Sequence, residues 1–251
     1  MEKIQQTLDW IDDRVKNYLS LMTGVVSSYT KDPERTRNAE SLLKTALRTA
    51  FFLDFFSETE DADFLREANK YKRLMYSNVS EQDRQDLQGI EKRIIKLFDY
   101  EKDIWANIKT GRKVSNEEIE QFWKMKSADS LFYGRVIRIF TRDKDFTTPL
   151  YAYTQILDGV LDLREYEQDF EGDLSNLLYM KLSQRMSLKR IPKQKKEAIS
   201  RAICFGAYSD LESFVEARAQ EVSSFDFGDC LPLKKAIEQK RREFHAEFVF
   251  H

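Results

Sequence analysis

Glycine and proline are scarce in this chain. Its 251 residues include 8 Gly and 4 Pro, together about 5% where about 12% is usual. Antiparallel sheets need these residues in tight turns, and phosphate-binding loops need glycine where the backbone approaches the ligand. The composition therefore argues against a β-sandwich, a Rossmann domain and a P-loop enzyme. With 41% hydrophobic and 33% charged residues, it is typical of long helices around a sizeable core.

Histidine and cysteine are almost absent. The two histidines, His245 and His251, stand at the C-terminal end, which excludes most histidine-based catalysis and the Glu-x-x-His di-iron bundles. The two cysteines, Cys204 and Cys230, form neither a disulfide framework nor the spacing of a zinc site.

An excess of positive charge and a long apolar run are also missing. The chain has 41 Lys and Arg against 43 Asp and Glu, a net charge of −2, whereas a nucleic-acid binder is usually basic. No stretch of about 18 apolar residues predicts a membrane span, and the N-terminus MEKIQQTLDW lacks a signal region. We expect a soluble cytoplasmic protein that binds no nucleic acid.

Apolar residues recur every three or four positions along most of the chain, which predicts helices. We predict one all-α domain over residues 1–251, or two intimately packed helical lobes, with eight to ten helices. The main expected helices, several of them with a Ser, Thr or Pro at the start, cover residues 2–29, 35–56, a run to 76, a run to 109, 116–140, 148–171, 193–205, 208–223 and 233–248.

The most informative segment is 151–176, in which acidic residues follow one another at steps of four, three, four and four. On a helix this spacing places them on one face. They are Asp158, Asp162, Glu165, Asp169 and Asp173. Like charges so spaced repel each other, so water, basic neighbours or bound cations must compensate. A solvated helix face is the ordinary interpretation, but the apolar neighbours of Asp158 and Asp162 favour a cleft, where such carboxylates suit Mg²⁺.

A second acidic group, Asp54, Glu58 and Asp61, has similar spacing and begins within the apolar stretch AFFLDFF. A carboxylate among phenylalanines is costly to bury unless it is paired or liganded. Two interpretations stay open: a helix end at which Asp54 pairs with a Lys or Arg, or a second set of metal ligands. The preceding residues place three basic side chains on one helix face, namely Arg37, Lys44 and Arg48.

These residues resemble the class I isoprenoid synthase superfamily. QILDGVLD (155–162) is similar to the second aspartate-rich motif of trans-prenyl diphosphate synthases, Q-I-x-D-D-x-x-D, with Gly159 in place of the middle aspartate. KSADSLFYGRVI (126–137) is similar to the family's K-T-x-x-L-F segment on the preceding helix. The first motif, D-D-x-x-D, is not spelled out: Asp54, Glu58 and Asp61 stand in for it only loosely.

The resemblance implies a helical bundle around a central cavity and Mg²⁺-assisted ionisation of an allylic prenyl diphosphate, leading to prenyl transfer or terpene cyclisation. It implies catalytic roles for Lys126, Asp158 and Asp162. It implies substrate contacts for Arg37, Lys44, Arg48, Lys126 and Gln155. It implies Mg²⁺ ligands at Asp54, Glu58, Asp61, Asp158, Asp162 and Glu165.

Two other functions stay open. The chain can keep this fold as a non-catalytic binding or scaffold protein, or be an unrelated helical adaptor whose acidic helix binds a basic partner. A homodimer is an expectation from the resemblance. A basic run is interpreted as a solvated face, a lid over a diphosphate, or a patch for peripheral contact with a membrane. It comprises Lys181, Arg185, Lys189, Arg190, Lys193, Lys195 and Lys196.

Overall fold

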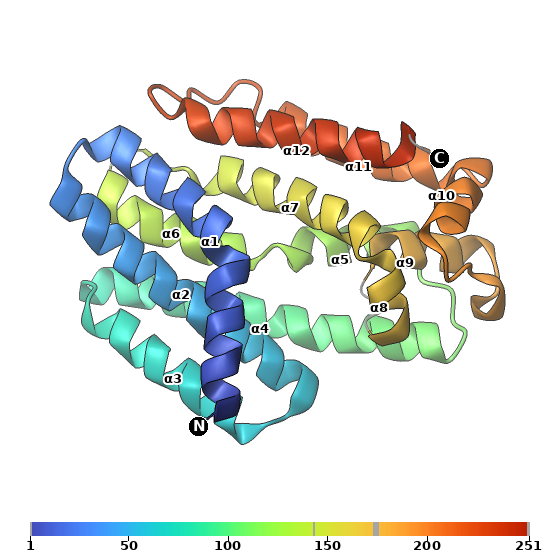
Figure 1. The fold of residues 1–251 in the computed structure, drawn as a ribbon, viewed down its shortest axis with the longest axis horizontal. Helices are drawn as coiled ribbons and strands as arrows, with labels where there is room; N and C mark the ends of the chain where they lie inside the picture. The colour runs from blue at the N-terminus through green and yellow to red at the C-terminus, as the bar shows by residue number, and fades with distance from the viewer. Residues whose placement is uncertain (1, 143, 173–175, 250–251) are drawn as a thin grey trace. The chain divides into compact units, whose positions relative to one another are not determined.

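Helices make up most of the part of the chain that the structure describes. A computed structural model describes residues 2–142, 144–172 and 176–249, so Asp173 and His251 lie outside the described residues. Within those ranges the backbone forms twelve α-helices, one short 3-10 helix and no strand (Figure 1). The all-α prediction is confirmed. No helix in these ranges is both long and apolar enough to cross a membrane.

The residues group into two compact units. Unit 1 comprises Met1–Ile94, Asp129–Leu150 and Phe227–Leu233, and unit 2 comprises Ile95–Ala128, Tyr151–Asp226 and Lys234–His251. Three of the five boundaries between the units fall inside helices, namely α4 (Glu81–Lys109), α7 (Thr147–Arg164) and α12 (Leu231–Val249).

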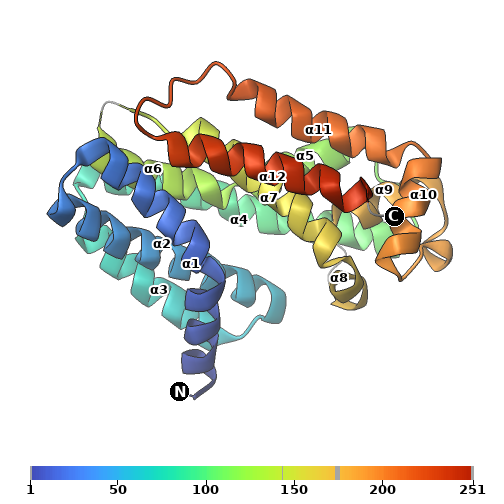
Figure 2. The same cartoon turned by 45° about the horizontal axis from the view of Figure 1, so that its top comes forward.

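Unit 1 is built on three successive helices, α1 (Glu2–Thr30), α2 (Pro33–Thr59) and α3 (Ala62–Ser77). They lie side by side in both views (Figures 1 and 2), and α6 (Asp129–Thr141) packs against α1 and α2. Asp32 begins α2 by accepting hydrogen bonds from two backbone N–H groups, ahead of Pro33 in the first turn, as expected for this pair. Buried Met22, Leu43 and Phe52 belong to the core.

Unit 2 contains α5 (Asn116–Lys126), α8 (Tyr166–Gly172), α9 (Leu177–Arg185), a 3-10 turn η1 (Leu188–Arg190), α10 (Lys195–Cys204) and α11 (Ala207–Glu221). Ser115 and Glu118 form a complete capping box at the start of α5, which confirms the predicted start of that helix. Trp123, Tyr166 and Phe244 are fully buried, and the ring of Trp123 stacks on Phe214 with centroids 3.7 Å apart.

Two of the predicted helices are interrupted. The helix expected over 116–140 breaks at Ser127 and Ala128, and the helix expected over 148–171 breaks at Glu165. The other predicted helices correspond to observed ones within a few residues. Both breaks adjoin the acidic and basic residues singled out above, so hydrophobic periodicity was least accurate beside the candidate site.

The predicted basic run does not form one solvated face. Lys181 is only 8% exposed, and its ammonium group lies 3.2 Å from Asp210 and 3.1 Å from the Asn116 side chain. Lys195 is half-buried and lies 2.6 Å from Glu247. The other members are exposed.

Candidate functional site

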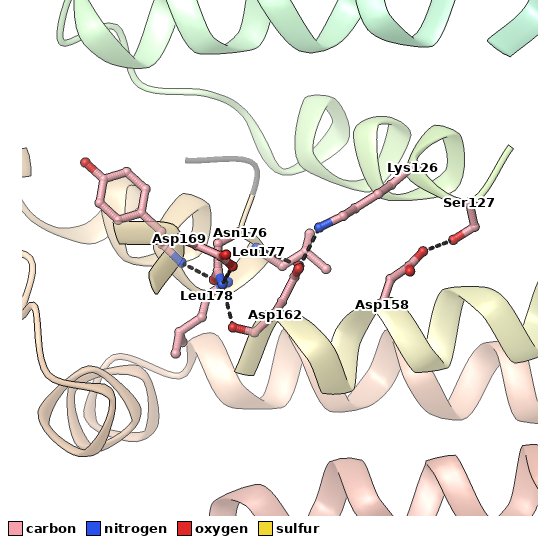
Figure 3. Close-up of polar contacts among 9 residues, drawn as sticks. Lys126, Ser127, Asp158, Asp162, Asp169, Asn176, Leu177 and Leu178 are labelled. Atoms are coloured by element: carbon pink, nitrogen blue, oxygen red, sulfur yellow. Dashed lines mark hydrogen bonds and ion pairs between the residues drawn. The ribbon is translucent and has the colours of Figure 1, made fainter. Parts of the chain in front are cut away.

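The two segments that carry the family resemblance meet in unit 2. Asp158 and Asp162 lie one turn apart on α7, and both point toward the end of α5 (Figure 3). Nζ of Lys126 lies 2.5 Å from Oδ1 of Asp162, and the hydroxyl of Ser127 donates to Oδ2 of Asp158. The break after α5 therefore places an ammonium group and a hydroxyl beside two carboxylates.

Asp162 also organises the start of α9. It is only 5% exposed, and its Oδ2 accepts a hydrogen bond from the backbone N–H of Leu177 at 3.0 Å. Asn176 donates to the backbone carbonyl of Asp162 at 2.5 Å and to Asp169 at 2.8 Å. The Asn176 side chain also accepts from the N–H groups of Leu178 and Tyr179 on α9, so these residues supply partners for helix N–H groups that would otherwise have none.

Gln155 is buried beneath this site. Its amide nitrogen donates to the backbone carbonyl of Trp123 at 3.2 Å, and its side chain is 0% exposed. Its oxygen, like the indole nitrogen of Trp123, has no hydrogen-bond partner among the described residues. Gln155 thus ties α7 to α5 from within the core.

Gly159 lies on a different side of α7 from the two aspartates. A Cβ at this position would come 3.1 Å from the Trp123 ring and 3.5 Å from the Phe244 ring. A side chain here would therefore meet aromatic packing. This contact gives a steric reason for glycine at position 159.

The predicted acidic stripe is not continuous. Asp158 and Asp162 belong to α7, Glu165 stands at the break, and Asp169 belongs to α8. The backbone N–H of Glu165 bonds to Leu161, while its carbonyl accepts from the N–H groups of Gln168 and Asp169, both at 2.9 Å. The break turns the chain so that Asp169 reaches Asn176.

The first acidic group belongs to unit 1. Asp54 is half-buried and Glu58 exposed near the end of α2, whereas Asp61 accepts from the N–H of Asp63 as the N-cap of α3 and lies 2.5 Å from Lys3. Among the described residues, no group of three or more His, Cys, Asp or Glu side chains is gathered as for a metal.

Tyr133 on α6 is fully buried among acidic residues of unit 1. Burial, followed by the charges of Asp129, Tyr18 and Asp54, raises the pKa of Tyr133 well above its ordinary value. Burial also raises the pKa of Asp129 to about 6. Asp129 follows Lys126 by three residues but was not among the predicted site residues, because a single acid without a spaced partner gives no pattern.

The predicted basic residues are partly engaged within unit 1. Lys44 lies 2.8 Å from Asp12, and Arg48 binds both carboxylate oxygens of Asp12, at 3.1 and 2.6 Å. Burial raises the pKa of Asp12, but the hydrogen bonds and charges of Arg48 and Lys44 outweigh it and hold that pKa below its ordinary value. Arg37 is exposed near the start of α2. A hollow of about 420 Å³ lies against α1 and α2, with Asp12 and Lys44 in its lining.

Two residues of the unit 2 cluster were missed by the sequence analysis. Ser127 and Asn176 are both buried and both act at helix boundaries. Asn176 precedes an apolar run, which is a recognisable N-cap pattern, whereas Ser127 has no comparable pattern.

No family model, curated protein or solved structure matches this chain. The resemblance to isoprenoid synthases therefore rests on the short motifs at 126–137 and 155–162.

Proposed function

We propose that this chain binds the diphosphate group of an allylic prenyl ester, together with Mg²⁺, at the cluster of Lys126, Ser127, Asp158 and Asp162, and promotes ionisation of that ester. The observation that supports this is the contact between the two motif segments: Lys126 and Ser127 at the end of α5 bind Asp162 and Asp158 on α7. The resemblance implies that the segments 126–137 and 155–162 lie on adjacent helices.

The donor chemistry of the cluster fits Mg²⁺. This ion prefers oxygen ligands and is usually held by one or two carboxylates together with substrate phosphates and water. Asp158, which is half-buried, and Asp162 would hold it, and the metal would neutralise charge on the diphosphate. The role of Asp54, Glu58 and Asp61 in unit 1 as further Mg²⁺ ligands stays a prediction from the resemblance.

The side chains themselves supply complementary roles. The Lys126 ammonium can stabilise negative charge on a departing diphosphate, and Asp162 positions that ammonium through their 2.5 Å contact. The Ser127 hydroxyl can donate a hydrogen bond to an anionic oxygen.

A non-catalytic helical binding or scaffold protein is the second candidate. It is favoured by Asp162, whose two carboxylate oxygens bind Lys126 and the N–H of Leu177, an arrangement that stabilises the fold without a ligand. The aromatic packing against Gly159 favours it too.

Thermal unfolding with Mg²⁺ alone, pyrophosphate alone and both together tests the proposal. A ligand present at about 100 times its dissociation constant adds about 2.7 kcal/mol, which shifts the Tm of a chain of this length by about 5 °C or more. We expect the shift only with both components and expect Asp158→Asn to abolish it. Asp103→Asn, at an exposed position of α4, is the matched control.

Release of pyrophosphate from prenyl diphosphates of increasing length then tests catalysis. Release by the wild type that is lost in Asp158→Asn supports an enzyme. A joint shift without release at any length favours the binding protein. If no joint shift occurs, both the metal site and the proposed reaction are wrong.

A further inference from the structure

The segment that connects α9 to α11 is strongly basic, unlike the chain as a whole. Residues 185–206 contain seven Lys and Arg residues and a single acidic residue, Glu197, in a chain whose net charge is −2. In unit 2 this segment includes η1 and α10, and α10 packs against both α9 and α11 (Figure 2). We call it the 185–206 surface.

Most of this positive charge faces solvent. Two of the seven basic side chains form ion pairs. Nζ of Lys195 lies 2.6 Å from the Glu247 carboxylate, and the Arg201 guanidinium lies 3.7 Å from the Glu197 carboxylate. The remaining five basic side chains are exposed, namely Arg185, Lys189, Arg190, Lys193 and Lys196. A cluster of this density attracts anionic surfaces.

Two large apolar side chains accompany the charges. Ile203 is 49% exposed and Phe205 is 40% exposed, on either side of the exposed Cys204. They stand at the end of α10, where Gly206 adopts a left-handed conformation (φ 72°) and α11 begins. The turn thus presents an aliphatic and an aromatic group to solvent.

We infer that the 185–206 surface docks the chain on a bilayer that contains anionic phospholipids. Basic side chains near such a surface gain about a fivefold increase in binding each, and apolar side chains at a turn can enter the boundary between headgroups and acyl chains. Charge alone would equally suit a nucleic acid. Phe205 suits either partner, because an aromatic ring can stack on a base or enter a bilayer. Ile203 favours the bilayer, because an aliphatic side chain gains from hydrocarbon and offers no stacking platform to bases.

Co-sedimentation of the full chain with sucrose-loaded vesicles tests this inference. Vesicles of phosphatidylcholine with about 30% phosphatidylserine are compared with phosphatidylcholine alone. We expect binding to the anionic vesicles, and expect the triple variant Lys189→Gln, Arg190→Gln, Lys196→Gln to bind about a hundredfold more weakly. The double variant Ile203→Ala, Phe205→Ala should bind about tenfold more weakly.

Matched controls separate location from total charge. Lys92→Gln, Arg93→Gln, Lys96→Gln removes the same charges from exposed positions of α4, and Leu74→Ala shortens a side chain that is 51% exposed. Both should bind like the wild type, and far-ultraviolet circular dichroism should show all variants folded. Three outcomes would each overturn the inference. The α4 variant could lose as much vesicle binding as the 185–206 variant, or the wild type could bind neutral vesicles as well as anionic ones. The third outcome is binding to a single-stranded oligonucleotide but not to vesicles. It does not depend on the proposed diphosphate site, because the readout needs neither Mg²⁺ nor pyrophosphate.

Discussion

The ammonium group of Lys126 lies 2.5 Å from the carboxylate of Asp162, although 36 residues separate them in the chain. Asp162 is almost fully buried, whereas about a quarter of the Lys126 side chain stays exposed. The same carboxylate accepts the first N–H of α9. One side chain therefore joins α5, α7 and α9, which gives it a structural role whether or not the site binds a ligand.

This relationship predicts that Asp162→Ala destabilises the fold. The substitution leaves the Lys126 charge and the Leu177 N–H without their shared acceptor, and we expect the free energy of unfolding to fall by about 2–4 kcal/mol. Urea denaturation measures it. Asp158→Ala is the comparison, with an expected loss below about 1.5 kcal/mol, because Asp158 is less buried and binds the small Ser127 hydroxyl. Equal losses for the two variants would refute the special structural role of Asp162.

Gly159 provides a second prediction. Gly159→Asp, which introduces the residue that the isoprenoid synthase motif has at this position, would place a carboxylate against the rings of Trp123 and Phe244. We expect a loss of about 3 kcal/mol or more, because a buried charge would have no partner there. Gly159→Ala should lose about 1 kcal/mol, since Trp123 is held by stacking on Phe214 and yields little to a new methyl group.

Thermal and urea unfolding of the two Gly159 variants check this prediction. Gly89→Ala is the matched control, because a Cβ at that position on α4 meets nothing within 4 Å and alanine is the better helix former. It should stabilise the fold slightly. If the Gly159→Asp variant is as stable as the wild type, the new carboxylate reaches solvent or a cation. A motif with all three aspartates would then be compatible with this fold.

Much of the helical framework followed from the sequence. The recurrence of apolar residues every three or four positions predicted a helix over 2–29, close to the observed Glu2–Thr30, because apolar spacing indicates which face of a helix is buried. The helix expected from residue 116 likewise begins there, as α5. These features are local, so neighbouring residues suffice to predict them.

The candidate site was only partly predictable. The sequence brought out Lys126, Asp158 and Asp162 through motif resemblance, and the structure brings these three together. It could not reveal that Asp162 caps α9 through Leu177, nor that Asn176 binds Asp169, because those contacts depend on breaks at Ser127 and Glu165. The apolar spacing continues through both breaks, so periodicity alone does not reveal them.

The basic residues predicted to bind substrate lead to a third test. Arg48 binds Asp12 through two nitrogens and is largely covered, so Arg48→Ala should lower the free energy of unfolding by about 1–2 kcal/mol. Arg37→Ala, at an exposed position, should change it by less than about 0.5 kcal/mol. Urea denaturation separates the two.

For Arg37 and Arg48, the shift of Tm with pyrophosphate and Mg²⁺ distinguishes a role in substrate binding from a structural role. If Arg37→Ala removes the joint shift with Mg²⁺ while leaving stability unchanged, that result supports the predicted role of Arg37 in substrate binding. If Arg48→Ala leaves the fold at full stability, the ion pair with Asp12 contributes nothing and the structural interpretation of Arg48 is wrong.

Asp129 makes stability depend on pH. Burial raises its pKa to about 6 in the folded chain, against about 3.9 in an unfolded one. Between these pH values the folded chain binds more protons than the unfolded chain, so the free energy of unfolding falls as pH rises from about 4 to about 6 and stays lowered above that range. We expect Asp129→Asn to remove this loss, because the amide never ionises.

The Asp129→Asn variant should therefore be more stable than the wild type at about pH 7.5, by about 1–2 kcal/mol. A pKa difference of about two units between the folded and unfolded chain would allow about 2.7 kcal/mol. We expect less because Asp129 is only half-buried. The difference should vanish below about pH 4, where the wild-type carboxyl is protonated in both states. Urea denaturation at several pH values from about 4 to about 7.5 measures the difference. Asp13→Asn, at an exposed position of α1, corrects for the loss of one negative charge. A difference between the Asp129→Asn variant and the wild type that is the same at every pH would show that packing, and not ionisation of Asp129, is responsible.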